Sequence, residues 1–103
     1  MNQTHGVNFN NISNATKITY LVVDEINTLI GIVEIIFYCQ TDYQFSAHVV
    51  ECIRPTQRRK GYGKLVRKKA IEECNSFGIK KDKISFECNS KACNDTMKKL
   101  IDF

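Results

Sequence analysis

The sequence predicts an α/β fold of the α+β type, in which a mixed antiparallel and parallel sheet is combined with two helices. Three observations predict this class. Runs rich in β-branched and aromatic residues recur along the first half of the chain, which is typical of strands. From Tyr62 the apolar residues recur at spacings of three and four, the period of an amphipathic helix. A length of 103 residues leaves room for one domain.

The first half of the chain predicts an arm followed by a β-hairpin. Residues 1–16 contain five Asn and few large apolar side chains, so we expect a flexible arm outside a single domain over 17–103. Lys17–Val23 and Leu29–Tyr38 each read as a strand. We expect these two strands to pair antiparallel across a turn at Asp24–Asn27.

A strand–helix–strand unit follows the hairpin. The third strand covers Phe45–Ile53 and ends before Pro55, because proline cannot extend a central ladder. The helix begins at Tyr62, and Gly78 is a good C-terminal stop. The apolar stripe of this helix consists of Tyr62, Leu65, Val66, Ala70, Cys74 and Phe77. Ile84–Cys88 is the fourth strand, expected parallel to the third because such units favour a right-handed crossover.

A second helix is expected to end the chain. Asn89 or Ser90 can cap its N-terminus. Its apolar stripe consists of Cys93, Met97 and either Leu100 or Ile101. The expected order is therefore strand, strand, strand, P-loop-like turn, helix, strand, helix.

The positive charge is concentrated in one segment. Residues 1–52 contain one Lys against five acidic residues, a net charge of −4. Residues 53–83 contain eleven Lys or Arg against three acidic residues, a net charge of +8, and residues 84–103 balance three against three. Such a segment indicates anion binding, and nucleic acid, a phosphorylated cofactor and a merely solvated helix face all stay open at this point.

Composition disfavours a membrane or secreted protein. The longest apolar-rich run, Leu29–Tyr38, contains Glu34 and is too short to span a bilayer. The first residues lack the apolar core of a signal peptide. The five cysteines form an odd set without a Cys-x-x-Cys pair, which favours reduced thiols over disulfides or a metal site. We therefore expect a cytoplasmic protein without a bound metal.

The segment between the third strand and the helix is the most informative part of the sequence. Gly61 and Gly63 remove side chains where a backbone must approach something closely. The helix that follows leaves its first N–H groups unpaired and presents the positive end of its dipole. Together with the basic residues 58–60, these groups make a site for a phosphate or pyrophosphate. The segment matches neither a Walker A loop nor a dinucleotide fingerprint.

This segment resembles the GNAT superfamily, whose members move an acetyl group from acetyl-CoA to an amine. The family signature is Arg/Gln-x-x-Gly-x-Gly/Ala, preceded by a hydrophobic-x-Pro strand exit. The matching residues are Arg58, Gly61 and Gly63 for the signature and Ile53, Arg54 and Pro55 for the strand exit. The resemblance spans about residues 17–103 and is most specific in residues 47–78.

The resemblance implies an acetyl-CoA-dependent N-acetyltransferase, in which a primary amine of a small molecule or peptide attacks the thioester directly. The N–H groups of the loop would bind the CoA pyrophosphate. The third strand would separate from the fourth and pair its open edge with the pantetheine arm, as with an added strand. The cofactor-binding residues implied are Glu51, Cys52, Ile53, Arg58, Arg59, Lys60, Gly61, Tyr62, Gly63, Lys64, Ser90 and Cys93.

Catalysis needs a neutral amine, so a general base or a water chain is expected. Family members with a Glu base carry it on the third strand, at the position that is Ala47 here. Glu51, on the same strand face, and His48, on the opposite face, are the two candidates. Many relatives carry a Tyr on the last helix as general acid, where this chain offers Thr96 or Cys93.

Two departures from the family and two alternatives stay open. The family usually has a strand and a helix pair before the position of Lys17, and closing strands after the position of Phe103. We therefore expect that the chain is either a fragment or completes its sheet through a partner. An unpaired sheet edge would favour a homodimer. One alternative function is a catalytically degenerate CoA-binding or regulatory module. The other, a small basic nucleic-acid binder, is disfavoured because Tyr62 and Phe77 lie on the apolar stripe rather than among the charges.

Overall fold

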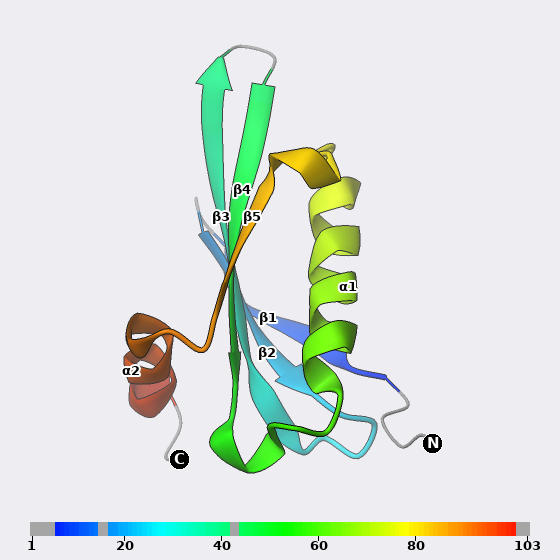
Figure 1. Ribbon diagram of the computed structural model, residues 1–103, viewed down its shortest axis with the longest axis vertical. Coiled ribbons are helices and arrows are strands. Elements are labelled where there is room, and N and C mark those ends of the chain that lie inside the picture. Colours follow the sequence, from blue (N-terminus) through cyan, green and yellow to red (C-terminus); the bar gives the residue numbers. More distant parts are fainter. Residues whose placement is uncertain (1–5, 15–16, 42–43, 101–103) are drawn as a thin grey trace.

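Five strands form one mixed sheet in the order β1-β2-β3-β4-β5, and a helix packs on each face of it (Figure 1). The computed structural model describes residues 6–14, 17–41 and 44–100. The elements are β1 (Asn8–Asn14), β2 (Lys17–Val23), β3 (Leu29–Thr41), β4 (Gln44–Ile53), η1 (Pro55–Gln57), α1 (Tyr62–Ser76), η2 (Lys81–Lys83), β5 (Ile84–Cys88) and α2 (Lys91–Leu100). The predicted α+β class is confirmed.

The predicted pairings are present. β2 and β3 form the expected antiparallel hairpin, and β4 and β5 form the expected parallel pair. β3 and β4 also pair, in antiparallel orientation. The turn between β2 and β3 forms because the Asp24 carboxylate accepts the N–H groups of Ile26 and Thr28 at 2.9 and 2.8 Å. Asn27 completes this turn with a φ of 66°, a left-handed conformation that Asn tolerates.

Gly31 on β3 lies directly against the backbone of β4. The β2–β3 register shifts between Val22 and Val23, which pair with Gly31 and Leu29. A Cβ at Gly31 would lie 2.0 Å from the backbone oxygen of Cys52. A glycine is therefore needed here because the neighbouring strand leaves no room for a side chain, and not because of an unusual φ.

The expectation of a flexible arm over 1–16 is wrong for β1. Asn8–Asn14 pairs antiparallel with β2, with Asn8 opposite Val23 and Asn14 opposite Ile18. Val7 is buried and the ring of Phe9 lies 5.1 Å from that of Tyr20, so two apolar side chains fasten an Asn-rich segment. Residues 1–5 and 15–16, which belong to the same predicted arm, lie outside the described residues.

α1 covers one face of the sheet through the predicted stripe. Tyr62, Val66, Ala70 and Cys74 are buried against the sheet, in a cluster that includes Ile35 and Val49. Phe77 departs from the expectation, because it is 53% exposed, with its ring 5.2 Å from the Phe37 ring in an edge-on arrangement. The helix ends as predicted, with Gly78 at a φ of 85°.

α2 packs on the opposite face over a smaller cluster. Its Cys93 and Met97 are buried against Ile32, Val50 and Cys52. Leu100 and Ile101, the other predicted members of the stripe, lie outside the residues whose side chains are described. α2 covers only one end of its face, and the ribbon shows no helix over the rest of that face (Figure 1). Within the described part of the chain, no helix is long and apolar enough to cross a membrane.

Candidate functional site

The loop between β4 and α1 has the backbone geometry of an anion site. Arg59 and Gly61 both adopt left-handed conformations, with φ values of 63° and 85°. Gly61 is the N-cap of α1, and no described side chain caps the first turn. The first N–H groups of a helix without such a cap remain available to a ligand, and left-handed residues in the preceding loop add to an anion-binding concavity.

A hollow of about 260 Å³ lies over this loop. Its walls are formed by Ile53, Gln57, Arg58, Arg59, Gly61, Tyr62, Gly63 and Asn89. A Cβ placed on Gly61 or Gly63 would meet no described atom within 4 Å, so no protein group fills the space above them. The left-handed φ of Gly61 explains why a glycine stands at that position. Neither a left-handed φ nor close packing explains why residue 63 is also a glycine. A ligand that approaches the backbone closely would explain it.

The three basic residues of the loop have different roles. The Arg58 guanidinium is anchored, because its Nε donates to the Ile53 carbonyl at 2.8 Å and its Nη2 to Asn94 Oδ1 at 3.1 Å. Arg59 is exposed beside the hollow. The Lys60 ammonium contacts Gln57 Oε1 at 3.3 Å. The side chain of Arg58 thus ties β4 to α2, while Arg59 is the exposed cation of the hollow's wall.

The junction of β4 and β5 differs from the expected open edge. Glu51 pairs with Cys88, and the Asn89 N–H donates to the Glu51 carbonyl at 2.8 Å. The Ile53 N–H, one of the groups expected to face the pantetheine arm, donates to Asn89 Oδ1 at 2.9 Å. The strands therefore remain together as far as Glu51, and the edge beyond is closed by the side chains of Asn89 and Arg58.

Glu51 lies on the α1 face and is held there by an arginine. Its carboxylate, 4% exposed, accepts from Arg67 Nε at 3.0 Å. The Arg67 guanidinium also lies 4.3 Å from the centre of the Phe86 ring. Burial raises the pKa of Glu51, although the hydrogen bond and charge of Arg67 oppose that rise. The carboxylate has a partner and little access to solvent, which does not suit a base that must reach an amine.

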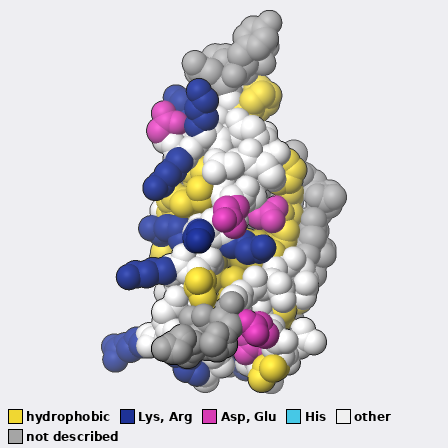
Figure 2. All heavy atoms as spheres, turned by 90° about the vertical axis from the view of Figure 1, so that its right-hand side faces the viewer, with side chains coloured by type: hydrophobic (Ala, Val, Ile, Leu, Met, Phe, Trp, Pro, Cys, Tyr) yellow, Lys and Arg dark blue, Asp and Glu magenta, His cyan; other side chains and the backbone are white. Residues whose placement is uncertain are grey.

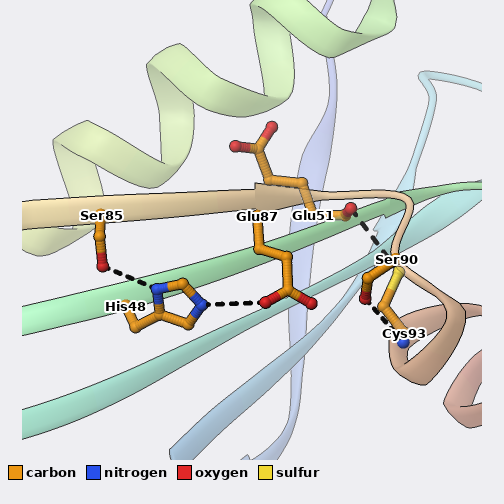
Figure 3. Close-up of polar contacts among 6 residues, drawn as sticks. All are labelled: His48, Glu51, Ser85, Glu87, Ser90 and Cys93. Atoms are coloured by element: carbon orange, nitrogen blue, oxygen red, sulfur yellow. Dashed lines mark hydrogen bonds and ion pairs between the residues drawn. The ribbon is translucent and has the colours of Figure 1, made fainter.

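His48 lies on the other face in a polar group. Its Nδ1 is 2.7 Å from Ser85 Oγ and its Nε2 is 3.3 Å from Glu87 Oε1. Figure 3 shows both partners extending from β5 towards the imidazole, with the Glu51 carboxylate on the opposite side of the sheet. Hydrogen bonds from Ser90 and then from His48 lower the pKa of Glu87. Both ring nitrogens of His48 thus have partners, on the face of the sheet opposite α1 (Figure 3).

Ser90 and Cys93 serve the start of α2. Ser90 Oγ accepts the Cys93 N–H at 3.1 Å, which confirms the predicted N-cap. The Cys93 side chain is buried, and burial raises its pKa and that of the neighbouring Cys52. Buried thiols of this kind are poor proton donors to a ligand in solvent. Thr96, the other candidate acid, donates to the Ala92 carbonyl at 3.0 Å.

Sequence reasoning missed several residues that shape this region. The sequence predicts neither the bridge from Asn89 to Ile53 nor the contacts of Asn94 and Arg67, and it places Ser85 and Glu87 only on a strand. A lone Arg on the polar side of an amphipathic helix, opposite a Glu on the neighbouring strand, was an available signal for the Arg67–Glu51 pair. The Asn89 bridge had no such signal, because it depends on how two strand ends meet.

Comparison with models of known protein families and with curated proteins finds no match for this chain. Among the described residues, no group of three or more His, Cys, Asp or Glu side chains is arranged to hold a metal ion.

Proposed function

We propose that this chain binds acetyl-CoA and transfers its acetyl group to a primary amine. The observation that carries the proposal is the unfilled hollow at the start of α1, bordered by Gly61 and Gly63 and by the exposed Arg59. Uncapped N–H groups, a helix dipole and a nearby cation suit a pyrophosphate. The resemblance to the GNAT signature at Arg58, Gly61 and Gly63 supports the same ligand.

The Asn89 bridge supports a place for the pantetheine arm. Asn89 Oδ1 is an amide oxygen that accepts the Ile53 N–H at 2.9 Å. The pantetheine arm carries amide carbonyls of the same chemistry, so one of them can replace Asn89 at this N–H. Five residues separate Ile53 from His48, which is about 16 Å of strand. The extended arm, with its two amide units, is on the order of 15 Å long. The proposal thus brings the thioester near His48.

His48 is the better placed of the two candidate bases. Both side chains have ion-pair partners, but the imidazole is partly exposed whereas the Glu51 carboxylate is buried. In the proposed reaction His48 Nδ1, reached through the Ser85 hydroxyl, accepts a proton from the substrate's ammonium group and leaves a neutral amine, while Glu87 holds the ring at Nε2. The amine nitrogen then bonds to the acetyl carbon, the carbon–sulfur bond breaks, and the leaving CoA thiolate takes up the second proton that the nitrogen loses.

A catalytically degenerate CoA-binding module is the second candidate. The closed junction favours it, because Asn89 already accepts the Ile53 N–H and Arg58 already donates to the Ile53 carbonyl. A reactive complex would place the pantetheine arm at this position. The two candidates share the ligand and differ only in turnover.

The first experiment measures thermal stabilisation by CoA, acetyl-CoA and pantetheine, which lacks the pyrophosphate. A ligand present at a hundred times its Kd stabilises the fold by about 2.7 kcal/mol. We expect CoA and acetyl-CoA to raise Tm and pantetheine not to do so. Gly63→Glu should abolish the shift by placing a carboxylate in the hollow. Asn75→Glu, which adds the same charge at the far end of α1, should retain it.

The second experiment measures thiol release from acetyl-CoA with a panel of amines. Release that depends on His48 and is lost in His48→Gln while CoA binding is kept supports the transferase. Binding without release for any amine supports the degenerate module. If millimolar CoA produces no stabilisation, both functions are refuted.

A further inference from the structure

β5 is an edge strand of the sheet. In the described part of the chain it pairs with β4 alone, so its outer side has no neighbour. The Asn89 N–H faces β4, and backbone groups alternate in direction along a strand. The N–H and C=O groups of Ile84, Phe86 and Cys88 therefore point away from β4. An exposed edge of this kind is a template for an added strand.

A basic groove borders this edge on the α1 side. It encloses about 490 Å³, and its walls are Lys64, Arg67, Lys68, Ile71, Glu72 and Lys81. Arg67 connects the groove to β5, because its guanidinium lies over the Phe86 ring and 3.1 Å from the Cys88 thiol. Figure 2 shows lysine and arginine side chains in a row along this side of the molecule.

The other side of β5 has a different charge. Ser85 and Glu87 project there, next to His48. A strand added to β5 would place alternate side chains on the two faces of the sheet. Its residues on the α1 face would meet Lys64, Lys68 and Arg67, and those on the other face would meet Glu87.

We propose that the outer edge of β5 binds an extended acidic peptide segment of a partner protein, as an added strand with acidic side chains at alternate positions facing α1. The main-chain bonds to β5 supply the register, and the basic groove selects the charge. This interaction goes beyond acetyl transfer, because it uses neither the hollow at Gly63 nor His48.

The structure favours a peptide over two other occupants. A second copy paired antiparallel through β5 would place both α1 helices on the same sheet face, so that the lysines of the two grooves would repel each other. A nucleic-acid strand would be expected to stack its bases on exposed rings, but the Phe86 ring beside the groove is covered by Arg67. Charge complementarity and an open strand edge together describe an acidic peptide.

The test measures fluorescence anisotropy of a labelled peptide of about eight residues, a typical strand length, with Glu at alternate positions and Thr or Lys between them. One control peptide has the same composition with its Glu residues grouped at one end. A second control is N-methylated on alternate amides, which blocks pairing with an edge but keeps the charge. An oligodeoxythymidine of equal charge is the nucleic-acid probe.

The combined Lys64→Glu, Lys68→Glu and Lys81→Glu changes should weaken binding of the alternating peptide by about tenfold or more. Lys91→Glu and Lys99→Glu on α2 reverse charge far from the groove and should leave it unchanged. Arg67 is kept, because its loss would leave Glu51 without its partner.

Binding that is specific for the alternating peptide and lost on N-methylation supports the proposal. Equal binding of the N-methylated or grouped peptide would show charge attraction without strand addition and overturn it. The proposal is likewise refuted by preference for the oligonucleotide, by absence of any peptide binding, or by light scattering that shows a dimer broken by the triple change. None of these outcomes depends on CoA binding.

Discussion

Two adjacent arginines show how side chains with the same charge take different tasks. Arg58 donates to the Ile53 carbonyl and to Asn94, whereas Arg59 is exposed at a positive φ. We expect Arg58→Ala to lower the free energy of unfolding by about 1–3 kcal/mol, because the partly buried Ile53 carbonyl loses this donor, while Asn94 Oδ1 keeps the Cys52 thiol as a donor. Arg59→Ala should stay within about 0.5 kcal/mol of the wild type. Urea unfolding measures both.

Ligand binding separates the same two residues further. Arg59→Ala should weaken CoA binding without a loss of stability, since only a cation at the hollow is removed. If Arg58→Ala proves as stable as the wild type, the two hydrogen bonds from its guanidinium contribute nothing, and its role as an anchor is refuted.

The buried Glu51 carboxylate makes stability depend on pH. Burial raises its pKa in the folded state above the ordinary value of 4.5. The folded protein then binds this proton more tightly than the unfolded chain does. The resulting stabilisation is fully present below pH 4.5 and is lost as the pH rises through the raised pKa.

Glu51→Gln tests this dependence directly. The amide cannot ionise, and its oxygen can still accept from Arg67. We expect the variant to lack the fall in stability that the wild type shows above pH 4.5, and to be at least as stable at neutral pH. Unfolding free energies measured across this pH range check it, with the exposed Glu72→Gln as control. A fall of equal size in Glu51→Gln would assign the effect to another group.

Among the elements, those with strong side-chain periodicity were predicted well. β2 and β5 have the predicted bounds, and α1 begins at the predicted Tyr62. β1 was missed because its Asn-rich sequence has little strand propensity. An edge strand can form through backbone pairing with β2, and the apolar contacts of Val7 and Phe9 follow no periodicity that the sequence reveals.

Two glycines at the ends of elements distinguish a structural from a functional requirement. Gly31→Ala should lower the free energy of unfolding by about 3 kcal/mol or more, because its Cβ would clash with the Cys52 carbonyl. Gly63→Ala should be neutral or stabilise the fold by up to about 1 kcal/mol, since alanine favours a helix and the space is open. Thermal and urea unfolding measure both changes.

The same pair of variants bears on the ligand. Gly63→Ala should lose CoA affinity while it keeps its stability, because the methyl group occupies the space that the pyrophosphate would approach. Full affinity in Gly63→Ala would contradict the placement of the pyrophosphate in this hollow.

At the scale of the whole molecule, the contacts that close the site join distant parts of the chain. The Ile53–Asn89 and Arg58–Asn94 hydrogen bonds each span 36 residues, and the Arg67–Glu51 bond spans 16. Periodicity within a window of the sequence indicates elements but not such partners. The sequence therefore predicted the loop and its glycines, while the closed junction became visible only when β4, β5 and α2 were placed together.

Under the proposed function, that junction would have two states, closed by Asn89 in the free protein and occupied by the pantetheine arm in the complex. Asn89 has a φ of 49°, which glycine adopts at little cost, so Asn89→Gly should fold. The variant frees the Ile53 N–H and removes the competition of the Asn89 amide. We expect its CoA affinity, measured by calorimetry, to rise by up to about tenfold, the equivalent of one hydrogen bond.

Hydrogen exchange at Ile53 supplies the structural readout for this variant. Without CoA, the Ile53 amide should exchange faster in Asn89→Gly than in the wild type, and CoA should restore its protection. Pantetheine alone should not protect it, because the pyrophosphate supplies most of the binding. If CoA binds but leaves the Ile53 amide unprotected in the variant, the arm does not pair with the end of β4. The Asn89 bridge would then be a structural tie between β4 and β5, and the route of the arm from the hollow towards His48 would have to be abandoned.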